Sequence, residues 1–334
     1  MSSDKKCARI YACGGAGINI AATFEAADAK NDIVQADVYL SYMDTSTSDM
    51  RNSNIDKEKV FIFTNKDGSE MDGSGQYRRT AVQPILAHTR ELLQKFQPES
   101  LNIVIHSASG GSGSVIGPLL TKELIKRGER VIVFMIADDK NLNFAKNTLA
   151  TIKTYANFVT EVETPIVSYL HVNQPRNSNA TENKAIHQAL NDVLTLFSGQ
   201  NASLDSMDLS NWLDYQKVTG QDAHLSTLFI NEETEEAAAR MSDRELGTPL
   251  TVATLSTNDH PNPYFAEVKY QCEGKAPNLF NVQGEVFNFA IHAGYFPYVI
   301  NRLKKTINAK SEAIESSVIA KVDAKDGDDN GLVF

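Results

Sequence analysis

This sequence has few cysteines, no long apolar run and no excess of basic charge. The three cysteines, Cys7, Cys13 and Cys272, lack the spacing of metal ligands, so we expect reduced and mostly buried thiols. No segment approaches about 18 uninterrupted apolar residues, and the polar residues 1–6 do not resemble a signal peptide, so we expect a cytosolic protein without a membrane span. The net charge of −10 argues against a nucleic-acid-binding surface over the whole protein.

Short apolar runs alternate with helical segments in the first part of the chain. With 42% apolar and 22% charged residues the sequence has ample material for a core, and 334 residues favour two domains over one. The alternation predicts an α/β fold, in which a Rossmann-like parallel sheet carries helices on both faces. Strands are expected at residues 9–12, 38–42, 60–63, 101–105, 130–136 and 166–172, and helices at 20–26, at 76–96 and from 115.

Beyond the sixth strand the pattern changes twice. Apolar residues spaced three and four apart predict a long helix from about residue 179 to 200. After about residue 220, four strands around one helix predict a smaller α+β domain, followed by a last helix and an acidic tail too polar and short to fold alone. The strands are expected at 225–230, 250–255, 265–270 and 286–291, the helix at 232–245, and the domains at 1–178, 179–220, 221–296, 297–322 and 323–334.

A loop rich in glycine and serine, residues 107–114, connects the fourth strand to the next helix. Its glycines let the backbone approach a ligand closely, and its N–H groups would point at an anion on the helix N-terminus, for which phosphate is the natural candidate. A flexible connection is the alternative that the local pattern leaves open. No lysine follows Gly113, which excludes a Walker-type P-loop, and Ser107 stands where a nucleophile elbow around Ser109 would need glycine.

Three glycine-rich loops, at residues 14–17, 68–75 and 110–113, each follow a predicted strand and precede a predicted helix. In an open α/β sheet such loops gather at the carboxyl edge of the strands, so together they predict a site that surrounds a di- or triphosphate. A Rossmann dinucleotide site is the competing interpretation, because the first loop has the right location. The sequence disfavours it, since residues 15–20 lack the third glycine and Asp37 precedes its strand instead of ending it.

Two carboxylates, Asp205 and Asp208, follow the long helix three residues apart. This spacing places them on one side of any helical turn. Aspartate is also a common helix cap, and Asp208 would cap a helix entered at Leu209. On spacing alone the capping interpretation is favoured.

Together these segments resemble the tubulin/FtsZ superfamily over nearly the whole chain. Residues 109–114 resemble its Gly-Gly-x-Gly-x-Gly signature loop, and residues 14–19 are similar to its first phosphate loop. Residues 189–194 resemble the central-helix stretch whose asparagine, here Asn191, reads the guanine base, and Asn173 matches the other position that contacts the base. The form of the signature loop, the modest length and the acidic tail are most similar to the PhuZ/TubZ branch from large phages and plasmids.

The resemblance implies a GTP site with Mg²⁺ and a catalytic pair, Asp205 and Asp208. If the chain stays mostly helical, Asp205 lies about 20 Å beyond Asn191, at roughly 1.5 Å per residue, and cannot reach the phosphates of its own subunit. In the family such carboxylates meet the nucleotide of the next subunit in a head-to-tail filament, where they would position the attacking water. The implied GTP- and GDP-binding residues are Gly14, Gly15, Ala16, Gly17, Asn19, Asp44, Thr45, Gly73, Ser74, Gly75, Ser109, Gly110, Gly111, Ser112, Gly113, Ser114, Asp138, Asn173 and Asn191.

The implied function is GTP-dependent filament formation that positions or segregates phage or plasmid DNA in the cytoplasm of a bacterial host. The implied partners are further copies of the chain, arranged head to tail, and a DNA-bound adaptor or a capsid as cargo. An NAD-dependent oxidoreductase and a non-hydrolysing tubulin-like binding module are the alternatives. The loop around residues 73–76 departs most from the family pattern, and Asp138 or Asp139 is the expected contact to the ribose.

Overall fold

The computed structural model describes residues 6–28, 36–50, 55–65, 67–69, 71, 78–174, 176–198, 204–230, 248–256, 268–276 and 286–326. Within these residues, ten strands form one sheet in the order β3-β2-β1-β4-β5-β6-β7-β10-β8-β9. The strands are β1 (Cys7–Cys13), β2 (Asp37–Asp44), β3 (Val60–Ile62), β4 (Leu101–Ser107), β5 (Val131–Ala137), β6 (Ile166–Val172), β7 (Leu225–Ile230), β8 (Thr251–Ser256), β9 (Tyr270–Lys275) and β10 (Val286–His292). The α-helices are α1 (Gly14–Asp28), α2 (Arg78–Lys95), α3 (Gly113–Lys126), α4 (Leu142–Val162), α5 (Asn179–Phe197), α6 (Ser206–Leu213), α7 (Tyr215–Thr219) and α10 (Tyr295–Asp326).

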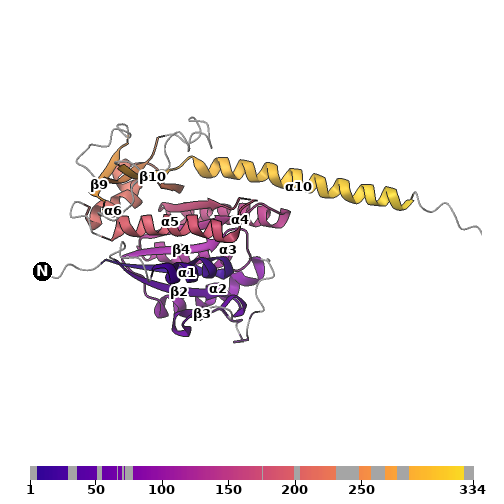
Figure 1. Ribbon diagram of the computed structural model, residues 1–334, viewed down its shortest axis with the longest axis horizontal. Helices are drawn as coiled ribbons and strands as arrows, with labels where there is room; N and C mark the ends of the chain where they lie inside the picture. Colours follow the sequence, from indigo (N-terminus) through magenta and orange to yellow (C-terminus); the bar gives the residue numbers. More distant parts are fainter. Residues whose placement is uncertain are drawn as a thin grey trace, which may run out of the picture.

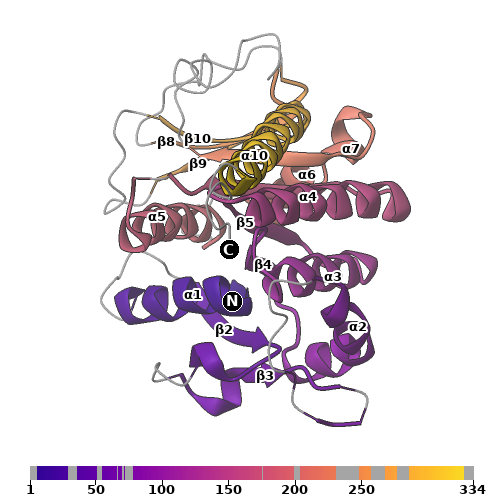
Figure 2. The same cartoon turned by 90° about the vertical axis from the view of Figure 1, so that its right-hand side faces the viewer.

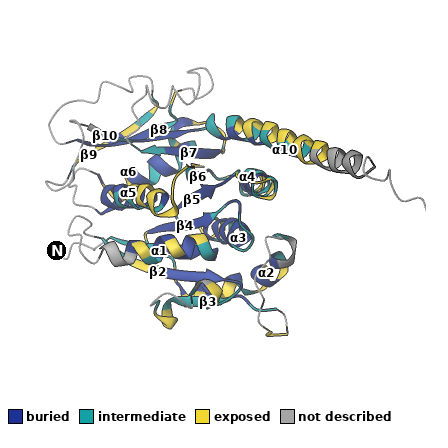
Figure 3. Ribbon diagram, turned by 45° about the vertical axis from the view of Figure 1, so that its right-hand side comes forward, coloured by how far each residue is buried: buried dark blue, intermediate teal, exposed yellow. Residues whose placement is uncertain are grey.

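The central strands are buried on both faces, as parallel strands between helices must be. Successive residues of β1 enter different cores: Ile10 and Ala12 belong to one cluster, Tyr11 and Cys13 to the other. Helices α1, α5 and α6 cover the first core, and α2, α3, α4 and the start of α10 cover the second (Figures 2 and 3). The predicted α/β fold with a parallel sheet is therefore confirmed.

The second half of the chain continues the same sheet. Strands β6 and β7 pair in parallel through Ile166–Ser168 and Leu225–Thr227, and β10 then runs antiparallel between β7 and β8. The predicted domain boundary at residue 221 therefore lies just before β7, the strand through which the sheet continues from the first half of the chain into the second. The long helix α5 lies where the sequence predicts it, and Ser178 caps its start by accepting a hydrogen bond from Thr181 N at 3.2 Å.

A turn and a strand differ from their predictions, and one predicted helix lies outside the described residues. The glycine-rich stretch from Gly14 forms the first turn of α1, not a turn before it. The strand predicted at residues 265–270 is instead β9, which begins at Tyr270 and buries only Cys272 and Gly274 on one face, so its sequence lacks the apolar alternation of a strand. The helix predicted at residues 232–245 lies outside the described residues.

The last helix, α10, starts on the body of the protein and then extends away from it (Figure 1). Its first turns bury Phe296, Val299 and Leu303 against the second core, whereas Ile314 is half exposed. The helix begins two residues before the predicted start at Pro297 and runs through Asp326, so residues 323–326, which we assigned to the acidic tail, are helical, and the rest of the predicted tail lies outside the described residues. None of the described helices has the length and apolar content needed to span a membrane.

Candidate functional site

A cavity of about 390 Å³ opens at the carboxyl edge of the sheet, where the predicted phosphate loops meet. The N-termini of α1 and α3 both face it, and helix N-termini present unpaired N–H groups and a partial positive charge to an anion. Asp44 is the one charged side chain among its described lining residues. The lining residues are Cys13, Gly14, Gly15, Ala16, Asp44, Ser46, Ser107, Ser109, Gly110, Gly111, Ser112, Gly113 and Phe144.

Glycine is required where the first and the signature loops touch each other. A Cβ on Gly113 would lie 2.6 Å from the Cys13 carbonyl oxygen, and one on Gly14 would lie 2.6 Å from Gly113 N. Gly14 also has φ +71°, a conformation that residues with a side chain rarely adopt. The two helix N-termini can therefore converge on one anion only because both loops carry glycine at the contact.

The substitution Gly113→Ala is expected to destabilise the fold by roughly 2 kcal/mol and to weaken nucleotide binding, because its Cβ would push the two loops apart. Thermal unfolding and titration with a fluorescent GDP analogue measure the two effects. Gly110→Ala is the matched control for stability, since a Cβ there would meet only Ser107 atoms, at 3.6 Å or more. Equal melting temperatures for the two variants would contradict the assigned contact.

Ser107 shapes the start of the signature loop, although it belongs to the predicted loop without being one of the predicted nucleotide-binding residues. Its Oγ accepts hydrogen bonds from Ser109 N at 3.2 Å and Gly110 N at 3.1 Å, and lies 2.9 Å from Ser109 Oγ. A hydroxyl oxygen has two acceptor positions, both used here by N–H groups, so the Ser107 proton is donated to Ser109. The Ser109 proton is then left to point at a ligand in the cavity.

Asp44 and Thr45 connect the end of β2 to the signature loop. Thr45 Oγ1 lies 2.6 Å from Ser112 Oγ, and Asp44 Oδ1 accepts a hydrogen bond from Thr45 N at 2.6 Å. Burial and the nearby Asp44 charge raise the pKa of the Cys13 thiol well above its usual value, so Cys13 stays protonated. None of the three cysteines forms a disulfide.

The donor set around Asp44 fits Mg²⁺ held mainly by a nucleotide. Among the described residues there is no cluster of three His, Cys, Asp or Glu side chains that would hold a metal by itself. Mg²⁺ typically binds through one or two carboxylates together with substrate phosphates. Asp44, 3% exposed at the edge of the phosphate cradle, is the carboxylate that could provide such a contact.

The predicted base and ribose contacts lie beside the cavity at the ends of β5 and β6. Asn173 Nδ2 donates to Asp138 Oδ2 at 3.4 Å, and Asp138 Oδ1 accepts from Lys140 N at 2.8 Å. Asn191 Oδ1, on α5, is buried without a hydrogen-bond partner among the described residues, so it is an acceptor that a base N–H could satisfy. These residues do not line the phosphate cavity itself.

The remaining predicted binding residues have other roles or lie outside the described residues. Gly17 packs against β4, where a Cβ would approach the Ile105 carbonyl oxygen at 2.5 Å. Asn19 is exposed on α1, and Ser114 Oγ donates to the Gly111 carbonyl at 2.8 Å. Gly73, Ser74 and Gly75 lie outside the described residues.

Three further lining residues had no sequence signal. They are Cys13 at the end of β1, Ser46 after β2 and Phe144 in the first turn of α4.

Asp205 and Asp208 form a capping box at the start of α6. Asp205 Oδ1 accepts from Met207 N at 2.7 Å and from Asp208 N at 2.9 Å, while Asp208 Oδ2 accepts from Asp205 N at 3.2 Å. The backbone donors of Asp208 and Met207 lower the pKa of Asp205, which is therefore ionised at neutral pH. The cap is Asp205 and not Asp208, and α5 ends at Phe197, so the chain between Asn191 and Asp205 is not one continuous helix.

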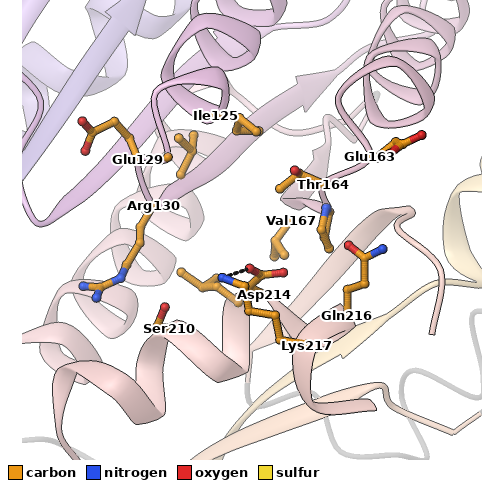
Figure 4. Close-up of a pocket in the computed structure, with 14 residues that line it drawn as sticks. Ile125, Glu129, Arg130, Glu163, Thr164, Val167, Ser210, Asp214, Gln216 and Lys217 are labelled. Atoms are coloured by element: carbon orange, nitrogen blue, oxygen red, sulfur yellow. Dashed lines mark ion pairs between the residues drawn. The ribbon is translucent and has the colours of Figure 1, made fainter. Parts of the chain in front are cut away.

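Helix α6 lies at the amino edge of the sheet, opposite the phosphate cavity. Its residues Ser210 and Leu213, and Asp214 directly after it, line a second cavity, of about 520 Å³, together with the amino ends of β5 and β6 (Figure 4). Asp214 pairs there with Lys217 at 2.7 Å. Strand β6 has seven residues and spans about 23 Å, so the two edges are separated by about that distance.

Comparisons with known proteins agree with this architecture. Residues 9–168 match the Tubulin/FtsZ family, GTPase domain. A phage tubulin-like protein of Pseudomonas phage phiKZ is 26% identical over 98% of both chains. Among solved structures, the protofilament of TubZ from bacteriophage PhiKZ superposes on this chain with a TM-score of 0.79, at 25% identity over 92% of each chain. The GDP complex of the phage tubulin PhuZ superposes with a TM-score of 0.77, at 19% identity over 92% of each chain. Residues 9–168 are thus similar to the Tubulin/FtsZ GTPase domain, and the chain as a whole is similar to phage tubulin-like proteins.

Proposed function

We propose that this chain binds GTP at the carboxyl edge of its sheet, assembles head to tail, and hydrolyses GTP at each interface with the neighbour's Asp205 and Asp208. The observation that carries the proposal is the position of these two carboxylates at the amino edge of the sheet whose carboxyl edge holds the phosphate cavity. Asp208 accepts a hydrogen bond from Tyr270, the first residue of β9, and Asp205 is close enough to Lys6, just before β1, for the two charges to interact. One subunit cannot bring both together. A head-to-tail contact does so, and a heterologous contact that does not close gives an open filament.

The side chains divide the reaction between two subunits. In one subunit, the N-termini of α1 and α3 and the Ser109 hydroxyl hold the phosphates and stabilise the charge that develops on them. In the next, Asp205, whose pKa is lowered by its backbone donors, and Asp208 orient the attacking water and accept its proton. Mg²⁺ with the nucleotide would neutralise phosphate charge, with Asp44 as the protein contact.

The phage relatives suggest where such filaments would act. We place the protein in the cytoplasm of a bacterial host, where its polymers would position or segregate phage DNA. Its principal partner is then another copy of itself, and its cargo would be a capsid or a DNA-bound adaptor.

Assembly of the purified protein tests this function. We expect filaments in GTP and Mg²⁺, measured by light scattering, pelleting and electron microscopy, and few or none in GDP, because only GTP gives the interface its γ-phosphate. GTP should also raise the melting temperature, and NAD should not, because only a ligand that binds the native state stabilises it. Equal assembly with GTP and GDP, or stabilisation by NAD alone, would contradict the proposal.

A further inference from the structure

Helix α4 carries three polar side chains on one face, behind the phosphate loop. Asn147, Thr151 and Tyr155 are spaced four residues apart, which stacks them along one side of a helix. Thr151 and Tyr155 have no exposed surface. Burying a polar group costs free energy unless the group is hydrogen-bonded, so the hydrogen-bond partners of these three side chains indicate their role.

These three side chains act on three consecutive residues of the phosphate loop, two of them directly and one through His106. Asn147 Nδ2 donates to the Ser109 carbonyl at 3.1 Å. The Thr151 hydroxyl shares its proton between the Ala108 carbonyl, 2.9 Å from Oγ1, and the Asn147 carbonyl of its own helix, at 2.8 Å. Tyr155 acts on Ser107 through His106, whose Nε2 lies 2.8 Å from Tyr155 OH and whose Nδ1 lies 3.1 Å from the Ser107 carbonyl.

The direction of the hydrogen bonds around His106 follows from its partners. A carbonyl oxygen only accepts, so Nδ1 carries the proton, and Nε2 must accept from the Tyr155 hydroxyl. Burial lowers the pKa of His106 to about 4, which keeps the ring in this neutral form at physiological pH. Gly117 provides the space, because a Cβ at that position would collide with the His106 ring.

The result is that three consecutive carbonyl oxygens of the loop are engaged: those of Ala108 and Ser109 by side chains of α4, and that of Ser107 by the His106 ring that Tyr155 holds. A carbonyl oxygen turned into the cavity would repel phosphate, because both carry negative charge. Holding the carbonyls behind the loop leaves hydroxyl and helix N–H donors on the cavity side.

We propose that Asn147, Thr151 and Tyr155, the last through His106, are positioning residues that fix the donor-only face of the phosphate loop and so set its affinity for the nucleotide phosphates. The inference rests on the proposed GTP function. These side chains touch the loop from the side away from the cavity and do not contact the nucleotide.

Thr151→Val tests the proposal with a matched control elsewhere in the chain. It removes one buried hydroxyl at nearly constant volume and is expected to weaken binding of GTP and of GDP about tenfold, since the Ala108 carbonyl is released. Thr251→Val removes an equivalent buried hydroxyl, which donates to the Trp212 carbonyl at 2.8 Å. It should lower the melting temperature comparably and leave both affinities within about twofold of the wild type. Thr151→Ser restores the hydroxyl and should restore the affinity.

Tyr155→Phe has a similar control in Tyr215→Phe, whose hydroxyl is bonded to Ser226 Oγ and His224 N, both at 2.9 Å. Only Tyr155→Phe should weaken nucleotide binding. Asn147→Ala, at a partly exposed position, gives a third measurement that does not depend on a core substitution. A wild-type chain that binds no GTP would overturn the proposed function. A wild-type chain that binds GTP while Thr151→Val, Tyr155→Phe and Asn147→Ala bind it equally well would overturn the positioning role alone.

Discussion

Replacing Asp208 with asparagine is expected to slow GTP hydrolysis by about 100-fold or more while leaving assembly in GTP intact. A positioned general base contributes roughly that factor, and asparagine cannot accept the proton of the attacking water. The capping bond to Asp205 N uses one carboxylate oxygen, which the asparagine carbonyl can replace, so α6 should keep its start. Phosphate release and filament lifetime measure the effect, and the filaments should persist in GTP.

Mixing two inactive variants distinguishes hydrolysis across the interface from hydrolysis within one subunit. Asp208→Asn keeps an intact phosphate cavity, and Gly113→Ala keeps an intact α6. If the aspartates act on the neighbour's nucleotide, the mixture regains phosphate release at interfaces that pair the intact cavity with the intact α6. No recovery in mixtures that co-assemble would contradict catalysis across the interface.

Asp214→Asn is the control for the loss of one negative charge at the amino edge of the sheet. Asp214 belongs to the same amino edge as α6 but pairs with Lys217 in the second cavity. This variant should hydrolyse GTP at the wild-type rate. A loss equal to that of Asp208→Asn would mean that net charge, and not the position of Asp208, determines the rate.

Asp192→Asn is expected to remove a large pH dependence from the stability of the fold. The Asp192 carboxyl is 4% exposed in α5, and among the described residues it accepts a side-chain hydrogen bond from Gln188 Nε2 at 2.8 Å. Burial raises its pKa to about 7, against about 3.9 in an unfolded chain. Between about pH 4 and 7 the folded chain keeps a proton that the unfolded chain releases, so raising the pH favours unfolding, by roughly 4 kcal/mol over the window.

Urea unfolding at pH 5, 6, 7 and 8 measures this effect. The wild-type free energy of unfolding should fall across that series and level off above about pH 7, where both states are ionised. Asp192→Asn should lose most of the decline, whereas the exposed Asp222→Asn should retain it. A wild-type decline that persists unchanged in Asp192→Asn would assign the pH dependence to other groups.

The phosphate site was predictable because its chemistry depends on backbone geometry. Gly14 and Gly113 are needed where two loops touch, and a side chain at either contact would collide with backbone atoms, so the requirement is visible as glycine in the sequence. The parallel strands were predictable for a similar reason. A strand such as β5, buried along its whole length, reads as a continuous apolar run.

The features that escaped prediction depend on partners distant in the sequence. Strand β9 contributes few apolar side chains, and only its pairing with β8 defines it. Ser46 and Phe144 reach the cavity from loops and helix starts that carry no motif. Asp205 and Asp208 fit a helix cap and a catalytic pair equally well, and their place at the edge opposite the cavity, which only the fold reveals, supports the second role in addition to the first.

The junction between β6 and β7 has a mechanical consequence. Three residue pairs join these strands, as few as join the edge strand β3 to β2, whereas β5 and β6 are joined by six. If each subunit carries a load through its sheet, the shear resistance of that sheet is lowest where the fewest hydrogen bonds cross. Under tension the two halves of the subunit would then separate at β6–β7 before β1, β4, β5 and β6 separate from one another, which would leave the strands behind the phosphate cradle intact.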